Sequence, residues 1–222
     1  MKFIRLILTA ACAAAVFACT GCTSSLEIHA LKDGGALVSF SAGLGSAFRS
    51  VVTSLSGENA DSALFNAGDM ASQFRAAGMD EVKVTVPTDS SVAVSTKLCA
   101  GASDPVSKAG LVSFTKNNSS SSMVLTLSPA NLSALYASLP ETVRSYIDLF
   151  MAPVFTGESM TKSEYLDLVA SVYGQNLADE IAVSYVSIVL SAPDTSGKKK
   201  KVSVPLADLL AASEPQTYAV SW

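Results

Sequence analysis

The chain has 222 residues, 49% of them hydrophobic and 15% charged, which is enough apolar material for one compact domain or two small ones. This composition excludes an intrinsically disordered chain. The formal net charge of -4 and the 7% of aromatic residues argue against a nucleic-acid partner, because they supply neither counter-charge for phosphates nor many rings on which bases could stack.

Residues 1–21 have the pattern of a secretory signal peptide. Lys2 and Arg5 precede an uncharged apolar run over residues 6–18, and small residues follow it. The run is shorter than the roughly 18 to 20 apolar residues that a membrane-spanning helix needs. We therefore expect this segment to direct export and to be removed, and we predict no spanning helix in the mature chain.

Two cysteines, Cys19 and Cys22, stand at the end of this signal. The sequence "CTGC" resembles the lipobox of bacterial lipoproteins, in which signal peptidase II cuts before a cysteine that carries diacylglycerol. The resemblance covers only the signal region, and Cys19 occupies the position at which the family pattern prefers leucine. It implies a multiply acylated Cys22, with Cys19 as the alternative acceptor. An ordinary signal peptide cut nearby is the other interpretation.

Acylation would tie the protein closely to a membrane. Two or three acyl chains hold a protein essentially permanently, and residues 22–25 would form a short lipidated tether. Because Thr23 rather than aspartate follows the acylated cysteine, the resemblance to bacterial sorting rules implies the outer membrane, on its periplasmic face or at the cell surface. Cys99 would then be the only free thiol of the mature chain, and we expect it to be packed inside the protein.

The first half of the mature chain predicts two β-hairpins with helices between them. Leu26, Ile28 and Ala30 alternate with polar residues before the turn sequence "DGG", which is a strong hairpin signal. The predicted elements are a hairpin over residues 25–42, helices over 45–57 and 61–78, a hairpin over 81–98 and a linker over 100–110.

The second half repeats this order. Ser128 and Pro129 begin one predicted helix, and Thr161 with Glu164 forms a capping box at the start of another. The predicted elements are a hairpin over 111–127, helices over 128–139, from 140 onward and over 161–174, paired strands over 181–190 and 200–206, a short helix over 207–213 and a strand over 217–222.

These elements predict an α+β fold, with a mainly antiparallel sheet built of hairpins and with helices packed on one face. We expect a single domain over residues 26–222. The shared order of hairpin, helices and hairpin in residues 26–98 and 111–206 is also what an old duplication would leave.

One dense charge run lies between the paired strands of the second half. It consists of Lys198, Lys199, Lys200 and Lys201. The run predicts a hairpin loop, whose lysines either stay in water and discourage aggregation or contact phospholipid headgroups near the anchor.

Two patterns bear on catalysis. His29 is the only histidine, and it lies on the polar side of the first predicted strand, so we expect an exposed side chain rather than a catalytic base. The sequence "SFTK" over residues 113–116 matches the S-x-x-K of penicillin-interacting serine enzymes. However, it lies in a predicted strand, and the companion motifs of those enzymes are absent.

Two further patterns bear on cofactors and metals. The sequence "GLGSAF" over residues 43–48 resembles the start of a dinucleotide-binding loop but lacks the third glycine, so it predicts only a strand-to-helix turn. The pairs Asp80-Glu81 and Asp179-Glu180 stand at predicted element boundaries, where acidic side chains commonly cap helices or face water. We therefore expect no cofactor and no metal site.

The sequence favours a membrane-anchored envelope lipoprotein that acts as a non-enzymatic binding or assembly module. Its expected partners are the membrane, through the lipid, and an envelope protein or lipid. The alternative is a cell-envelope hydrolase whose active site the sequence does not reveal. A deep apolar cavity in the folded protein would favour lipid binding.

Overall fold

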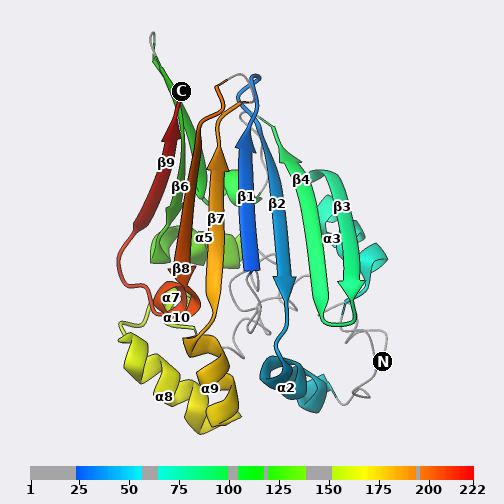
Figure 1. The fold of residues 1–222 in the computed structure, drawn as a ribbon, viewed down its shortest axis with the longest axis vertical. Coiled ribbons are helices and arrows are strands. Elements are labelled where there is room, and N and C mark those ends of the chain that lie inside the picture. The colour runs from blue at the N-terminus through cyan, green and yellow to red at the C-terminus, as the bar shows by residue number, and fades with distance from the viewer. Residues whose placement is uncertain (1–23, 57–64, 100–104, 118–119, 139–151, 194–195) are drawn as a thin grey trace.

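The computed structural model describes residues 24–56, 65–99, 105–117, 120–138, 152–193 and 196–222. The strands of these residues are β1 (Ser24–Ala30), β2 (Ala36–Gly43), β3 (Asp80–Thr88), β4 (Ser91–Leu98), β5 (Val112–Lys116), β6 (Ser121–Leu127), β7 (Tyr185–Ser191), β8 (Lys199–Pro205) and β9 (Gln216–Ser221). They form a six-stranded sheet in the order β3-β4-β2-β1-β7-β8 and a three-stranded sheet in the order β5-β6-β9 (Figure 1).

Three hairpins build the six-stranded sheet, as the sequence predicted. In the first, Gly34 adopts a positive φ of 88° and the Asp33 carboxylate accepts a hydrogen bond from the Gly35 N–H at 2.9 Å, which closes the turn. All neighbouring strands run antiparallel except β1 and β7, which are parallel, with Ser24 opposite Val186. The predicted α+β class and the mainly antiparallel pairing are therefore confirmed.

The two faces of the six-stranded sheet differ in polarity. In β1, Leu26 and Ile28 are buried on one face and Glu27 is exposed on the other, because successive side chains of a strand point to opposite sides. The buried face packs against helices behind the sheet and against the three-stranded sheet (Figure 1). On the other face Glu27 lies opposite Ser39, which lies opposite Ser95. This face is polar, as expected of an antiparallel sheet that meets water on one side.

The three-stranded sheet joins the hairpin β5-β6 to the C-terminal strand β9, and all its pairs are antiparallel. We expected one sheet rather than two. The two halves of the chain also place their hairpins differently: β1-β2 and β3-β4 are neighbours in one sheet, whereas β5-β6 and β7-β8 lie in different sheets.

The helices of the described residues connect the strands. They are α2 (Ser46–Ser56), α3 (Ala67–Ala76), α4 (Pro105–Lys108), α5 (Pro129–Ser138), α7 (Pro153–Thr156), α8 (Lys162–Tyr173), α9 (Gln175–Ala182) and α10 (Leu206–Leu210). The predicted capping box is present, since the Glu164 N–H donates to the Thr161 hydroxyl and the Thr161 N–H donates to the Glu164 carboxylate. Within the described chain, each helix is too short or too polar to cross a membrane.

Several element boundaries differ from the predicted ones. Helix α3 begins at Ala67 because the Asn66 side chain accepts hydrogen bonds from two N–H groups of its first turn. The strand expected over 181–190 begins at Tyr185, since α9, which was not predicted, extends to Ala182. Within the expected linker, residues 105–108 form α4. The helix predicted from residue 140 lies outside the described residues.

Helices α2, α8 and α9 gather at the end of the six-stranded sheet where β1 begins (Figure 1). At this end the Glu180 carboxylate of α9 accepts hydrogen bonds from two N–H groups in the first turn of α2, those of Ala47 at 2.9 Å and Phe48 at 3.2 Å. A Cβ atom at Gly45 would clash with this carboxylate. The turn that resembled a dinucleotide loop therefore holds a carboxylate of the protein itself, and Glu180 lies within a helix rather than at a boundary.

Candidate functional site

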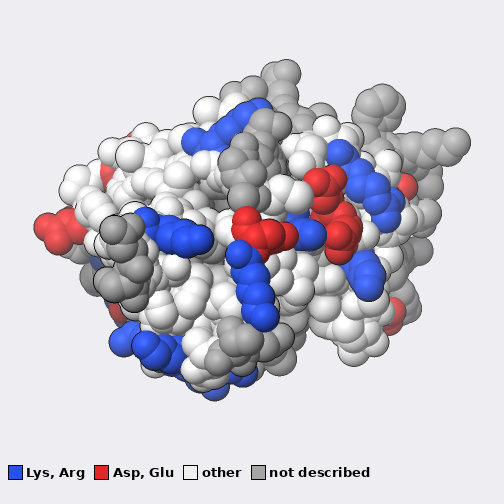
Figure 2. Space-filling model, turned by 90° about the horizontal axis from the view of Figure 1, so that it is seen from above, with Lys and Arg blue, Asp and Glu red and all other residues white. Residues whose placement is uncertain are grey.

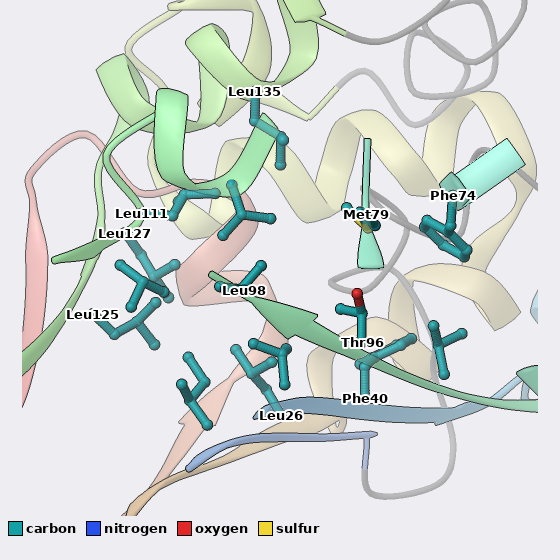
Figure 3. Close-up of a pocket in the computed structure, with 15 residues that line it drawn as sticks. Leu26, Phe40, Phe74, Met79, Thr96, Leu98, Leu111, Leu125, Leu127 and Leu135 are labelled. Atoms are coloured by element: carbon teal, nitrogen blue, oxygen red, sulfur yellow. The ribbon is translucent and has the colours of Figure 1, made fainter. Parts of the chain in front are cut away.

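An apolar cavity of about 100 Å³ lies between the two sheets (Figure 3). Its floor is the buried face of the six-stranded sheet. Leu26 of β1, Phe40 of β2 and Val94 of β4 line it, and each is followed and preceded by a residue that points away from it. The period of two in these strands is what directs a continuous apolar surface toward the cavity.

The opposite wall comes from parts of the chain that are distant in sequence. Leu125 and Leu127 of β6 and Leu135 of α5 line one side, while Phe74 of α3 and Met79 line the other. Figure 3 shows these side chains directed toward a common space. Strand β6 and helices α5 and α3, which the sequence assigned to separate hairpins and helices, thus line one site together with the six-stranded sheet.

Thr96 of β4 is the one polar side chain among the described residues that line the cavity. Its hydroxyl donates a hydrogen bond to the Asp80 carbonyl oxygen at 2.7 Å. The hydroxyl proton is therefore already used within the protein. The cavity can bind a group by removing it from water, but it offers no free hydroxyl proton of Thr96 with which to orient a polar one.

The walls of the cavity are almost entirely apolar, so water inside it finds few hydrogen-bond partners on the protein. An apolar group that entered would replace such water and gain contacts with these walls. Ligand binding and stability are therefore linked at this site.

The residues that the sequence offered for catalysis do not meet at the cavity. His29 is half-buried on the polar face of β1, opposite Leu37 of β2 and level with Ser191 of β7. Ser113 and Lys116 are exposed on β5, in a strand rather than at the start of a helix. The geometry that S-x-x-K chemistry requires is absent at these residues.

The prediction that Cys99 is packed inside the protein is wrong. Cys99 is exposed just beyond the end of β4, and its Sγ lies 3.6 Å from a carboxylate oxygen of Asp80. Partial desolvation, then the hydrogen bond to Asp80 and the negative charge of Asp80, raise the pKa of the Cys99 thiol. The neutral thiol is thus favoured over the reactive thiolate.

The lysine run is mostly strand rather than loop. Lys199, Lys200 and Lys201 open β8, an edge strand, and Lys198 precedes it; all four side chains are exposed. Lys199 pairs with Ser191 at the end of β7, whereas Ser24 pairs with Val186 near the start of that strand. The run therefore lies at the opposite end of the sheet from the point where β1 begins. Seen from that end, blue and red side chains are interspersed (Figure 2).

The predicted acylation sites, Cys22 and Cys19, lie outside the described residues. Strand β1 nevertheless begins at Ser24, so two residues of the expected tether, Ser24 and Ser25, belong to the sheet. Among the described residues no group of three or more His, Cys, Asp or Glu side chains is placed to hold a metal ion.

Neither a scan against protein-family models nor a search of curated proteins finds a match to this chain. Function must therefore be argued from the residues themselves. Sequence reasoning missed the cavity because alternation marks which residues face inward but not which of them leave space between them.

Proposed function

We propose that the protein is a lipid-anchored cell-envelope protein that binds a small apolar group between its two sheets, as a binding module rather than an enzyme. The apolar cavity carries this proposal. The sequence "CTGC" supports the anchor, at Cys22 or alternatively at Cys19, and Thr23 supports the outer membrane. An acyl chain of an envelope lipid is the expected source of the apolar group.

The size of the cavity limits what it can take. In another protein, an apolar cavity of roughly 150 Å³ stays dry and binds benzene. The cavity here is smaller, about 100 Å³, so a few methylene groups at the end of a chain would fill it. A complete lipid would not fit.

Two successive inward-facing residues of β4 provide a matched test. Val94 lines the cavity, whereas Val92 is buried in the core without lining it. We expect Val94→Phe to fill the space at little cost, while Val92→Phe overpacks the core and lowers the free energy of unfolding by about 1 to 3 kcal/mol.

The ligand site is then tested with n-hexane as the probe. Saturating n-hexane should raise the melting temperature of the wild type and of Val92→Phe, measured by circular dichroism, but not that of Val94→Phe. A rise of equal size in Val94→Phe, or no rise in the wild type, would exclude the cavity as a binding site.

The anchor is tested by metabolic labelling with an alkyne fatty acid. The wild type and Cys19→Ala should incorporate the label, and Cys22→Ala should not, because the acyl chains are attached to Cys22. Incorporation by Cys22→Ala but not by Cys19→Ala would assign the anchor to Cys19. Absence of label from the wild type would reject lipidation.

A further inference from the structure

Four of the exposed large apolar side chains belong to elements at the end of the six-stranded sheet where β1 begins. Leu55 is in the last turn of α2, Val172 is in the last turn of α8, Val183 follows α9, and Tyr185 is the first residue of β7. Their exposed fractions range from 45% to 69%. These elements lie together at one end of the molecule (Figure 1). We call these four residues the apolar end.

The other large apolar side chains exposed among the described residues, Leu37 and Phe114, lie elsewhere. Leu37 is beside the β1-β2 turn, at the opposite end of the sheet, and Phe114 is in β5 of the second sheet. Single exposed apolar residues are normal on any protein. The concentration of four of them at one end is therefore the observation that needs an explanation.

The chain enters the fold at this same end. Ser24 is fully buried and pairs with Val186, the residue after Tyr185. Cys22 is two residues before Ser24, and two extended residues span about 7 Å. Chain length alone therefore holds any group on Cys22 within about 7 Å of the start of β1, where Tyr185 is the nearest residue of the apolar end in sequence to the pairing partner Val186.

We propose that the apolar end docks on the lipid bilayer, with Leu55, Val172, Val183 and Tyr185 at the boundary between headgroups and acyl chains. The proposal rests on the acylation of Cys22 proposed above, because the short tether is what holds this end against the membrane. Moving aliphatic side chains from water to this boundary lowers the free energy of the system. A tyrosine ring also favours this boundary, because the ring is apolar and its hydroxyl group is polar.

The helices at this end carry more acidic than basic side chains: Glu164 and Asp167 of α8 and Asp179 and Glu180 of α9, against Arg49 of α2 and Lys162 of α8. Asp179 is exposed on α9 and accepts a hydrogen bond from Gln175 at 2.7 Å, and Glu180 binds the first turn of α2. The lysine run is at the far end of the sheet. Anionic headgroups would therefore add little electrostatic binding energy at this end. We expect a zwitterionic bilayer as the partner and a mainly apolar contact with it.

The single tryptophan provides an internal control for orientation. Trp222 follows β9 at the opposite end of the molecule, where its backbone exchanges two hydrogen bonds with Ser121 at 2.8 and 2.9 Å (Figure 1). In lipidated protein reconstituted into vesicles of brominated phosphatidylcholine, we expect strong quenching of the Tyr185→Trp/Trp222→Phe variant and less than a tenth of that quenching in the wild type. Equal quenching of the two proteins would overturn the proposal.

A second experiment removes the anchor. A chain that starts at Thr23 retains every described residue and should cosediment weakly with phosphatidylcholine vesicles. Replacing all four residues of the apolar end with Ser should weaken this binding at least tenfold, whereas Leu37→Ser/Phe114→Ser, the matched control, should leave it unchanged. Circular dichroism establishes that each variant is folded. A wild-type chain that ignores the vesicles, or a control that binds as weakly as the test variant, would overturn the proposal.

The two proposals fail separately. If the wild type incorporates no labelled fatty acid but the unlipidated chain binds vesicles, the proposed anchor is rejected and the proposed docking surface is retained. Normal labelling with equal quenching at both ends would retain the anchor and exclude docking through the apolar end.

Discussion

At the end of the six-stranded sheet where β1 begins, the Glu180 carboxylate accepts hydrogen bonds from the backbone N–H groups of Ala47 and Phe48. At the other end Lys97 lies 4.0 Å from the Asp33 carboxylate and 3.7 Å from that of Glu81, and the two acidic side chains are 62% and 65% exposed. The Glu180 carboxylate joins two helices, whereas Lys97, which is 28% exposed, faces two carboxylates that remain largely in water. A charge is expected to stabilise this fold more where it binds backbone N–H groups in the first turn of a helix than where its partner carboxylates remain largely in water.

The largest effect is expected at Glu180. Glu180→Ala leaves two N–H groups of α2 without their acceptor, so the free energy of unfolding should fall by about 1 to 2 kcal/mol, measured by urea denaturation. Asp179→Ala is the neighbouring control; its carboxylate binds only the exposed Gln175 side chain in the described contacts, and it should cost less than about 0.5 kcal/mol. Equal losses would show that Glu180 does not cap α2.

A smaller loss, about 1 kcal/mol, is expected for Gly45→Ala. The added Cβ meets the Glu180 carboxylate, which must then shift away from the N–H groups it binds. The same substitution in the Glu180→Ala background should cost nearly nothing, because the clash is gone. A double-mutant cycle from denaturation curves measures this coupling, and independent, additive losses would contradict it.

At the opposite end, Lys97→Met should lower the free energy of unfolding by less than about 0.5 kcal/mol. Methionine keeps most of the apolar stem and removes only the charge that faces Asp33 and Glu81. The remaining small loss should disappear in high salt, since salt screens exposed pairs. A loss as large as that of Glu180→Ala would remove the difference between the two ends.

The smallest effect is expected when Lys198, Lys199, Lys200 and Lys201 are all replaced with Ser. Their position far from Ser24 favours solvated side chains over headgroup contact. Folding, membrane retention and vesicle binding should therefore remain as in the wild type. Cosedimentation of the unlipidated chain with anionic vesicles at low salt is the measurement; binding that these substitutions abolish would instead support headgroup contact by the lysines.

Much of the local structure could be predicted because its causes lie within a few residues. The "DGG" turn closes through Asp33 and Gly35, and the capping box joins Thr161 to Glu164. The exposure of Cys99 could have been predicted as well. In β4 the inward residues are Val92, Val94, Thr96 and Leu98, so the next position points to the other side.

The candidate site could be predicted only in its parts. Alternation marks Leu26 and Phe40 as inward-facing, and helical spacing does the same for Phe74, but neither pattern states which surfaces meet. The cavity exists because side chains of the two sheets and of α3 and α5 fail to fill the space between them. Packing of that kind depends on the relative position of whole elements.

The α+β class, the hairpins and the caps at Ser128 and Thr161 could be read from the sequence alone, because turns, such caps and alternating burial depend on neighbouring residues. The parallel pairing of β1 with β7, the separate three-stranded sheet and the cavity between the sheets depend instead on how distant segments pack. The same holds for Glu180, which binds an N–H group 133 residues away. Such contacts form between segments that no local pattern brings together, and they are selected by the packing of the complete chain.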